Sequence, residues 1–217
     1  MYRPAMFRED RPEILHALMR AHPLATLVTA GSQGLEANLL PFLLAEVDGT
    51  WVLRAHLARA NGQLAALREG GPALVIFQGP DAYVSPAWYP SKAEHGKVVP
   101  TWNYATVQAR GTPRVIEDAA WLRAQIEALT GQQEAGREAP WQVGDAPQDF
   151  IEATMRAIIG LEIPIDSLEG KWKVSQNRGE ADRAGVVAGL RREGARTGDG
   201  EAMAMLVTQG GGAAPAA

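Results

Sequence analysis

The sequence of 217 residues contains no cysteine, few aromatic residues and no long apolar run. The absence of cysteine excludes disulfide bonds and thiolate metal sites. The longest apolar stretch, "NLLPFLLAEV", is interrupted by Pro41 and is far shorter than the roughly 20 residues of a membrane-spanning helix. The charged start, "MYRPAMFRED", lacks the apolar core of a secretory signal. We therefore expect a cytoplasmic protein that binds no metal and no membrane.

An excess of basic residues is also missing. The formal net charge is −4 and the signs are interspersed, so the chain lacks the positive excess that nonspecific binding to nucleic acids uses. No helix-turn-helix pattern is evident. The segment "GLRREGAR" at 189–196 could form a local basic surface, although a solvated helix face has the same composition. We therefore expect DNA binding, where it occurs, to be weak or indirect.

The order of the predicted elements favours an α+β fold, a small antiparallel β-barrel with peripheral helices. Apolar residues at helical spacing predict an opening helix that is capped by Asp10 and ends before Pro23. Three strands are expected next, at 24–30, 35–47 and 50–57. The Asp48-Gly49 pair predicts a hairpin between the last two. Because these strands follow one another directly, a doubly wound parallel sheet is disfavoured.

A short helix capped by Asn61 and a strand over "PALVIFQG" are expected in the middle of the chain. A polar, proline-rich excursion from 79 to 100 then separates this strand from the long strand "WNYATVQARGTPRVI". The prolines and glycines near residue 112 predict a kink in that strand. Excursions of this length inside a compact domain are typically functional when they are ordered.

Two helices are expected after residue 117, the first capped by Asp118 and stopped by Gly131. The second is expected to begin with a capping box near Gln148 and to end at Gly160. An extended segment then leads to a helix over "ADRAGVVAGLRREGA". We divide the chain into a β-barrel domain at 1–178, a C-terminal helical extension at 179–208 and a disordered tail at 209–217.

The segment "RAHLARANGQL" at 54–64 has the features of an anion site. A strand ends there, and Arg59 lies two residues before a helix cap. Helix N-termini attract negative charge, and a guanidinium group presents paired donors to a phosphate. The alternative is an ordinary surface arginine beside a capped helix.

The chain has only six Trp, four Tyr and four Phe, yet five of these rings fall within twenty-two positions, at Tyr83, Trp88, Tyr89, Trp102 and Tyr104. Neighbouring polar residues supply donors of the kind that bind the edge of a heteroaromatic ring, among them Ser85, Lys97, Thr101 and Asn103. The combination indicates a site for a flat ligand. A corner of the core, or a loop that packs against a neighbouring subunit, is the alternative.

The segment "GKWKVSQN" at 170–177 alternates charged and aromatic residues. On a strand, Lys171 and Lys173 would point to one side and Trp172 to the other. An anionic ligand or a nucleic-acid phosphate would suit the lysines, and an edge strand protected by lysines is the alternative. The four histidines show no metal-ligand spacing, and no nucleophile-elbow, dinucleotide or Walker-type motif occurs.

Together these motifs resemble the PaiB family, also called FMN-binding negative transcriptional regulators. The likeness runs from residue 1 to about 190, through "MYRPAMF", "RAHLARAN", "IFQGPDAYVSPAWYPSK", "VPTWNY", "LEGKWKVSQNR" and "DRAGVVAGL". The family is similar to the pyridoxamine phosphate oxidases. The resemblance implies an FMN-binding split β-barrel, FMN as the cofactor, and a homodimer with the flavin at the subunit interface.

The resemblance also implies roles for single residues. His56, Arg59 and Asn61 would hold the FMN phosphate and ribityl chain. The isoalloxazine would be lined by Tyr83, Ser85, Trp88, Tyr89, Thr101, Trp102, Asn103 and Tyr104. Further cofactor-binding candidates without an assigned role are Lys171, Lys173 and Gln176. Relatives generally read "NHLP" where this chain has "NLLP", so Leu39 replaces a histidine, and any chemistry of that histidine would be altered or lost here.

Two functions follow from the resemblance. The first is a flavin-binding negative transcriptional regulator. The alternative is a flavin-dependent oxidoreductase of the pyridoxamine phosphate oxidase-like type, in which the protein positions and shields the ring. A haem-binding split barrel is the third hypothesis, with His56 and His95 as its only axial candidates. No catalytic residue is assigned.

Overall fold

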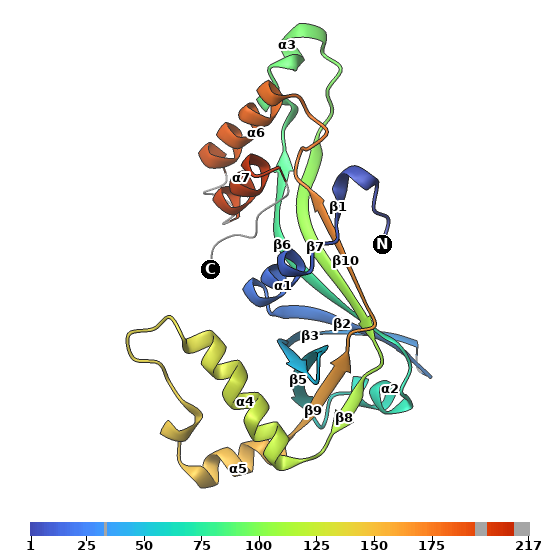
Figure 1. The fold of residues 1–217 in the computed structure, drawn as a ribbon, viewed down its shortest axis with the longest axis vertical. Coiled ribbons are helices and arrows are strands. Elements are labelled where there is room, and N and C mark those ends of the chain that lie inside the picture. The colour runs from blue at the N-terminus through green and yellow to red at the C-terminus, as the bar shows by residue number, and fades with distance from the viewer. Residues whose placement is uncertain (33, 194–198, 211–217) are drawn as a thin grey trace. The chain divides into compact units, whose positions relative to one another are not determined.

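The structure is a computed structural model that describes residues 1–32, 34–193 and 199–210. The chain folds into two compact units, each of which is described by itself. Unit 1 comprises Met1–His22, Phe77–Gln108 and the chain from Leu168 onward, and unit 2 comprises Pro23–Ile76 and Ala109–Ser167. The long strands β6 (Ala73–Val84) and β7 (Thr101–Gly111) continue from one unit into the other (Figure 1).

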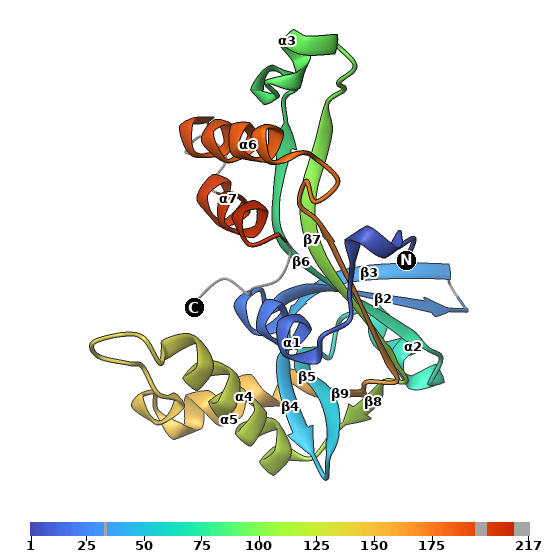
Figure 2. The same ribbon diagram turned by 45° about the horizontal axis from the view of Figure 1, so that its top comes forward.

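Unit 1 is a curved antiparallel sheet with helices around it. Its strand order is β1-β10-β7-β6, with β1 at Arg8–Glu9 and β10 at Ser167–Lys173. Its helical elements are η1 (Ala5–Phe7), α1 (Pro12–Ala21), η2 (Pro86–Trp88), α3 (Ser91–His95), α6 (Glu180–Glu193) and α7 (Gly200–Thr208). Helices α6 and α7 pack side by side (Figure 2). Buried apolar side chains on α1 and β10, such as Leu15, Leu18 and Trp172, form part of its core.

Unit 2 contains two sheets. The first continues from β6 into β2 (Leu24–Gly31) and β3 (Gly34–Pro41), and the second has the order β4-β5-β9-β8. The strands of the second sheet are β4 (Leu43–Val47), β5 (Thr50–Ala58), β9 (Ile158–Pro164) and β8 (Arg114–Ile116). The helical elements are α2 (Gln63–Glu69), α4 (Ala119–Glu134), η3 (Val143–Asp145) and α5 (Gln148–Arg156). The strand pairs for which the register is known are antiparallel, so the expected antiparallel α+β class is confirmed.

The opening helix is confirmed, but its predicted cap is wrong. Helix α1 buries Ile14, Leu15, Leu18 and Met19, as their spacing predicts. Its N-cap is Arg11, whose N–H donates to the Glu9 carboxylate, whereas Asp10 pairs with Arg3. The carboxylate that serves the helix start therefore comes from one residue earlier in the chain.

The second predicted strand is two strands. The chain leaves the first sheet after Pro41, which has no N–H for the ladder, and Phe42 donates instead to the carbonyl of Pro23. Phe42 is almost fully buried at this corner. The Asp48-Gly49 hairpin is confirmed, since both residues have positive φ (50° and 77°) and the flanking residues pair.

Three further predicted boundaries are wrong. Strand β6 continues to Val84, so the excursion between strands begins six residues later than the predicted residue 79. Helix α4 continues past Gly131 to Glu134, because a single glycine lowers helix stability without ending the helix. Gly160 lies inside β9, where a Cβ would collide with the ring of Trp121.

The capping box forms one turn earlier than predicted, between Gln142 and Asp145. The predicted kink near residue 112 is a true break, which separates β7 from β8. Helix α7 lies within the predicted C-terminal helical extension at 179–208, although it was not predicted as a separate helix. The end of the expected disordered tail, 211–217, lies outside the described residues, and the division at residue 178 stays a prediction. Over the described residues, no helix combines the length and apolarity needed to cross a membrane.

Candidate functional site

In unit 2, the predicted anion-site arginine belongs to a cluster of charged residues. One Nη of Arg59 lies 3.4 Å from Glu117 Oε2, and its Nε donates to the carbonyl of Arg156. Arg68, on α2, donates to the other oxygen of Glu117 at 2.9 Å. Two guanidinium groups thus share one carboxylate. Their hydrogen bonds, that of Arg68 first, hold the pKa of Glu117 below its usual value.

A pocket of about 250 Å³ opens beside this cluster. Arg59, Glu117 and Arg156 form part of its wall, and Leu122 and Met155 supply apolar surface. The mixture of guanidinium groups and apolar side chains suits a ligand that has an anionic end and a carbon chain.

The loop that carries Arg59 is fixed by buried polar contacts. Asn61 Oδ1 accepts from the N–H of Gln63 at 2.9 Å, so Asn61 serves the helix start although Gly62 is the N-cap residue. Gln63 is fully buried, and its amide donates to the carbonyl of Leu27 and the hydroxyl of Thr29 on β2. The sequence did not point to Gln63, because a glutamine in a helix usually faces solvent.

His56, on β5, contacts α4. Its Nδ1 lies 2.9 Å from Oε1 of Gln125, which is almost fully buried. The amide oxygen faces the ring, and Nδ1 donates to it in the tautomer that carries its proton there. The other end of the amide, Nε2 of Gln125, is buried and has no hydrogen-bond partner among the described residues.

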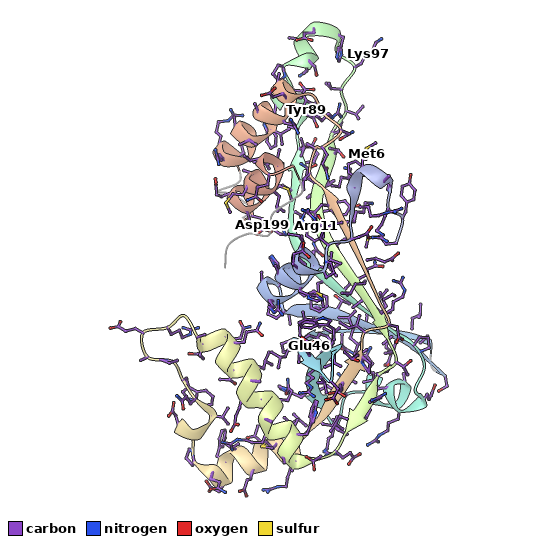
Figure 3. All side chains as sticks on the ribbon, viewed as in Figure 1. Met6, Arg11, Glu46, Tyr89, Lys97 and Asp199 are labelled. Atoms are coloured by element: carbon purple, nitrogen blue, oxygen red, sulfur yellow. The ribbon has the colours of Figure 1, made fainter. Side chains whose placement is uncertain are left out.

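In unit 1, two of the predicted isoalloxazine residues, Tyr89 and Asn103, are buried, and two more, Trp88 and Ser85, are half-buried. Tyr89, which Figure 3 labels, is 2% exposed. The guanidinium of Arg178 lies 4.7 Å from its ring centre. Trp88 packs against the glycine face of α6 and donates to Glu193 at 3.2 Å. Ser85 accepts from the N–H of Ala87 in η2. These side chains anchor the loop on α6, and their role in cofactor binding stays a prediction.

The second buried residue is Asn103, which is 1% exposed and donates to Ser175 Oγ at 2.9 Å. Gln176 is engaged locally as well. Its Oε1 accepts from the N–H of Val174, and its Nε2 donates to the carbonyl of Trp172. Both contacts shape the turn after β10.

The remaining aromatic residues of the segment face outward. Tyr83 and Trp102 are 47% and 55% exposed, and their rings meet edge to face with centroids 5.9 Å apart. Nζ of Lys171 lies 5.2 Å from the ring centre of Tyr104. Lys173 Nζ donates to the hydroxyl of Thr101 and the carbonyl of Trp102.

The charge of Lys173 is disfavoured where it lies. Burial lowers the pKa of this amine, and the neighbouring charges of Lys171 and Arg178 lower it further. As predicted, Lys171 and Lys173 lie on one side of β10 while Trp172 is buried on the other.

The predicted site residues thus form two groups. His56, Arg59 and Asn61 lie in unit 2, and the rest lie in unit 1. Arg68 and Glu117 were not predicted, because their contact joins α2 to the segment before α4 and no local pattern encodes it. Within the described part of the chain, no three His, Asp or Glu side chains are grouped as a metal site would require.

Comparisons with known proteins agree on the family. A sequence model of the family described as "Putative FMN-binding domain" matches residues 1–167. An uncharacterized protein of Emericella nidulans is 38% identical over 97% of this chain and 98% of its own length. The PaiB protein of Bacillus subtilis, named Protease synthase and sporulation protein PAI 2, is 28% identical over 89% of this chain and 90% of its own length.

Among solved structures, the FAD and heme binding protein of Mycobacterium smegmatis aligns with a TM-score of 0.56 and 25% identity. The alignment covers 76% of this chain and 73% of that one. The expected split-barrel fold is therefore confirmed. The chain belongs to the FMN-binding domain family that includes the PaiB proteins.

Proposed function

We propose that this protein binds FMN, with the phosphate held by Arg59 and Arg68. The observation that carries the proposal is the sharing of one carboxylate, Glu117, by two guanidinium groups beside a pocket. One carboxylate neutralises only one of the two charges, and a phosphate would neutralise the remainder through charge-assisted hydrogen bonds. The cluster lies within the residues that match the FMN-binding domain family.

The neighbouring residues suit the ribityl phosphate end of the cofactor. Arg59 is 40% exposed at its side chain, so an incoming phosphate can reach it. The second ring nitrogen of His56, Nε2, suits a hydrogen bond with a ribityl hydroxyl. A flavin bound here would supply one- or two-electron transfer, and the protein would contribute its orientation and its shielding from water.

A homodimer is the second part of the proposal. Leu24, Leu35 and Leu39 are 59%, 79% and 62% exposed. The pairing of Thr26 with Leu39 and of Ala30 with Leu35 places these side chains on one face of the β2–β3 ladder. Contiguous exposed apolar surface marks an interface, and a two-fold partner is its commonest occupant. We propose that a second copy covers this face and that the flavin lies at the interface.

A regulatory role is supported by the resemblance to PaiB and not by a DNA-binding surface. On α6, Arg191 pairs with Glu201 at 3.1 Å, and Arg192 pairs with Glu193 at 3.0 Å. These acidic partners compensate the charges that would otherwise attract phosphates. We therefore propose that any effect on transcription is indirect, with an FMN-dependent oxidoreductase as the alternative.

Calorimetric titration of the purified protein with FMN tests the proposal. We expect saturable binding of about one FMN per protomer together with a dimer in sedimentation. Absence of saturable binding at millimolar FMN would exclude a flavoprotein. Oxidation of NADPH by the loaded protein above the rate of free FMN would favour the oxidoreductase, and its absence would favour the regulator.

A further inference from the structure

A cationic aromatic surface in unit 1 lies outside the proposed phosphate site. We define this surface by Tyr83 on β6, Trp102 and Tyr104 on β7, and Lys171 and Lys173 on β10. The lysines lie beyond residue 167, where the match to the FMN-binding domain family ends. The function proposed above does not use them.

Strand geometry gathers these side chains on one face. On β10, Gly170 and Trp172 are buried against α1 and the core, so the alternate residues Lys171 and Lys173 face the other way. Arg8 on β1 pairs directly with Lys171, which brings a third cation to the same ladder. Like charges that lie opposite each other destabilise a sheet.

No carboxylate neutralises the two lysines. Neither forms an ion pair within the described residues, although Lys171 is only 9% exposed. The nearest acid along the strand, Glu169, is held by the N-terminal amine at 2.9 Å and by Arg3 at 3.5 Å. Asp10 and Glu9 are likewise paired with arginines.

The partners of Lys171 are aromatic rings instead. Its Nζ lies 5.6 Å from the ring centre of Tyr2 and 5.2 Å from that of Tyr104. Rings of this kind attract a cation without neutralising it, so the positive charge remains available to an anion. Protection of a sheet edge does not explain Lys171, because β1 pairs with β10 at this residue, whereas Lys173 lies beyond the paired residues.

Exposed rings lie next to these charges. Tyr83 and Trp102 present a pair of half-exposed rings, and Trp102 follows Thr101, whose hydroxyl Lys173 contacts. Exposed aromatic rings next to basic side chains bind ligands that combine a planar ring with a phosphate. The Cα atoms of residues two apart on a strand are about 7 Å apart. The long side chains of two such lysines can therefore both reach one phosphate group.

We propose that the cationic aromatic surface binds a nucleotide-type ligand, with its ring on Tyr83 and Trp102 and its phosphate on Lys171 and Lys173. Two sources share this chemistry, FMN itself and a nucleotide without a flavin. In both, the phosphate supplies the negative charge that the unit lacks at this position.

The test compares each nucleotide with its dephosphorylated form. FMN and riboflavin, and AMP and adenosine, are titrated into the dimer or monomer as purified. The ratio of the two dissociation constants within a pair reports the phosphate contact alone. We expect phosphate to tighten the binding of at least one pair by roughly 10- to 100-fold, as charge-assisted hydrogen bonds do.

The variant K171M/K173M should abolish this tightening, whereas K92M, which changes an exposed lysine of the same unit, should keep it. W102A should weaken the phosphorylated and dephosphorylated forms equally, by about 5- to 100-fold. Circular dichroism and the melting temperature show whether each variant folds. If K171M/K173M does not fold, W102A tests the proposal.

The FMN and AMP pairs distinguish the two possible ligands, FMN itself and a nucleotide without a flavin. Loss of the AMP effect in K171M/K173M supports a second nucleotide and leaves the FMN proposal intact. Loss of the FMN effect supports this surface as the flavin phosphate site and contradicts the role of Arg59. An unchanged phosphate effect in both pairs, or no binding of any of the four compounds, overturns the proposal.

Discussion

Asn103 donates a hydrogen bond of 2.9 Å to the hydroxyl of Ser175 in the interior of unit 1. The two residues are 1% and 4% exposed, and Ser175 has a positive φ of 64°. The contact joins β7 to the turn after β10 and fixes the end of the strand that carries the two lysines. A buried polar pair of this kind is costly to break from one side.

Asn103→Ala should lower the free energy of unfolding by about 1–3 kcal/mol, because Ser175 would lose its buried donor. The double variant with Ser175→Ala should lower the free energy of unfolding by less than the sum of the two single variants, since it leaves no partner unsatisfied. Urea denaturation measures all three. Strict additivity would show that the two side chains do not depend on each other.

Gly189→Ala should destabilise unit 1, because a Cβ at this position of α6 would overlap the ring of Trp88. Overpacking of this kind costs about 1–3 kcal/mol. Gly179→Ala, just before the same helix, is the control, since no atom lies within 4 Å of its added Cβ. Thermal unfolding compares the two. Equal melting temperatures would mean that Trp88 does not pack on α6 in solution.

The stability of the protein should fall as the pH decreases through the range of histidine titration. Burial lowers the pKa of His22, and the carboxylate of Asp199 opposes this only in part. Below about pH 6.5 the unfolded chain therefore binds a proton at His22 that the folded chain does not yet bind, so unfolding becomes more favourable.

His22→Gln, which is neutral at every pH, should lose this part of the pH dependence. The measurement is the free energy of unfolding of both proteins from pH 8 to pH 5. The difference between the two curves should change as the pH falls, and a constant difference between them would show that His22 titrates normally.

Leu35→Lys/Leu39→Lys should convert the proposed dimer to a monomer, because two charges on the exposed face of β3 would have to be buried at the interface. Sedimentation velocity at micromolar concentration detects the change. Glu46→Lys is the control, because Glu46 is exposed and lies on β4, in the other sheet of the unit. A wild-type monomer would contradict the dimer outright.

The sequence predicted those elements that local signals encode. Asp118 caps α4 as expected, its carboxylate accepting from the N–H of Trp121, and the Asp48-Gly49 turn joins two strands. The failures share a physical cause. Gly160 resembles a helix end in the sequence, but packing against Trp121 makes it the residue that β9 requires, and such a contact has no local signature.

The candidate site was predicted in the same uneven way. The alternation in "KWK" correctly placed both lysines on one side of a strand, because the period of a strand is fixed by its backbone. The aromatic segments could not be divided by sequence into inward and outward residues. Tyr89 is buried beside Arg178, whereas Trp102 is exposed. Tertiary contacts alone decide which of these rings is buried.

Glu117 sets an upper limit on the affinity of the proposed phosphate site. Its carboxylate occupies donors of Arg59 and Arg68 that a phosphate would need. Glu117→Gln should therefore tighten FMN binding by roughly 5-fold at most, because an exposed charge pair contributes little. Weaker binding of FMN to this variant would mean that Glu117 orients the arginines rather than competing for them.

The most direct measurement of the central claim is the ratio of riboflavin to FMN dissociation constants in Arg59→Met. Arg123→Met is the matched control, because Arg123 is similarly exposed, pairs with a glutamate in the same unit and lies away from the pocket. We predict that Arg59→Met weakens FMN by about 10- to 100-fold while leaving riboflavin unchanged, and that Arg123→Met changes neither. Equal weakening of both ligands, or no weakening of FMN, would contradict the assignment of the phosphate to Arg59.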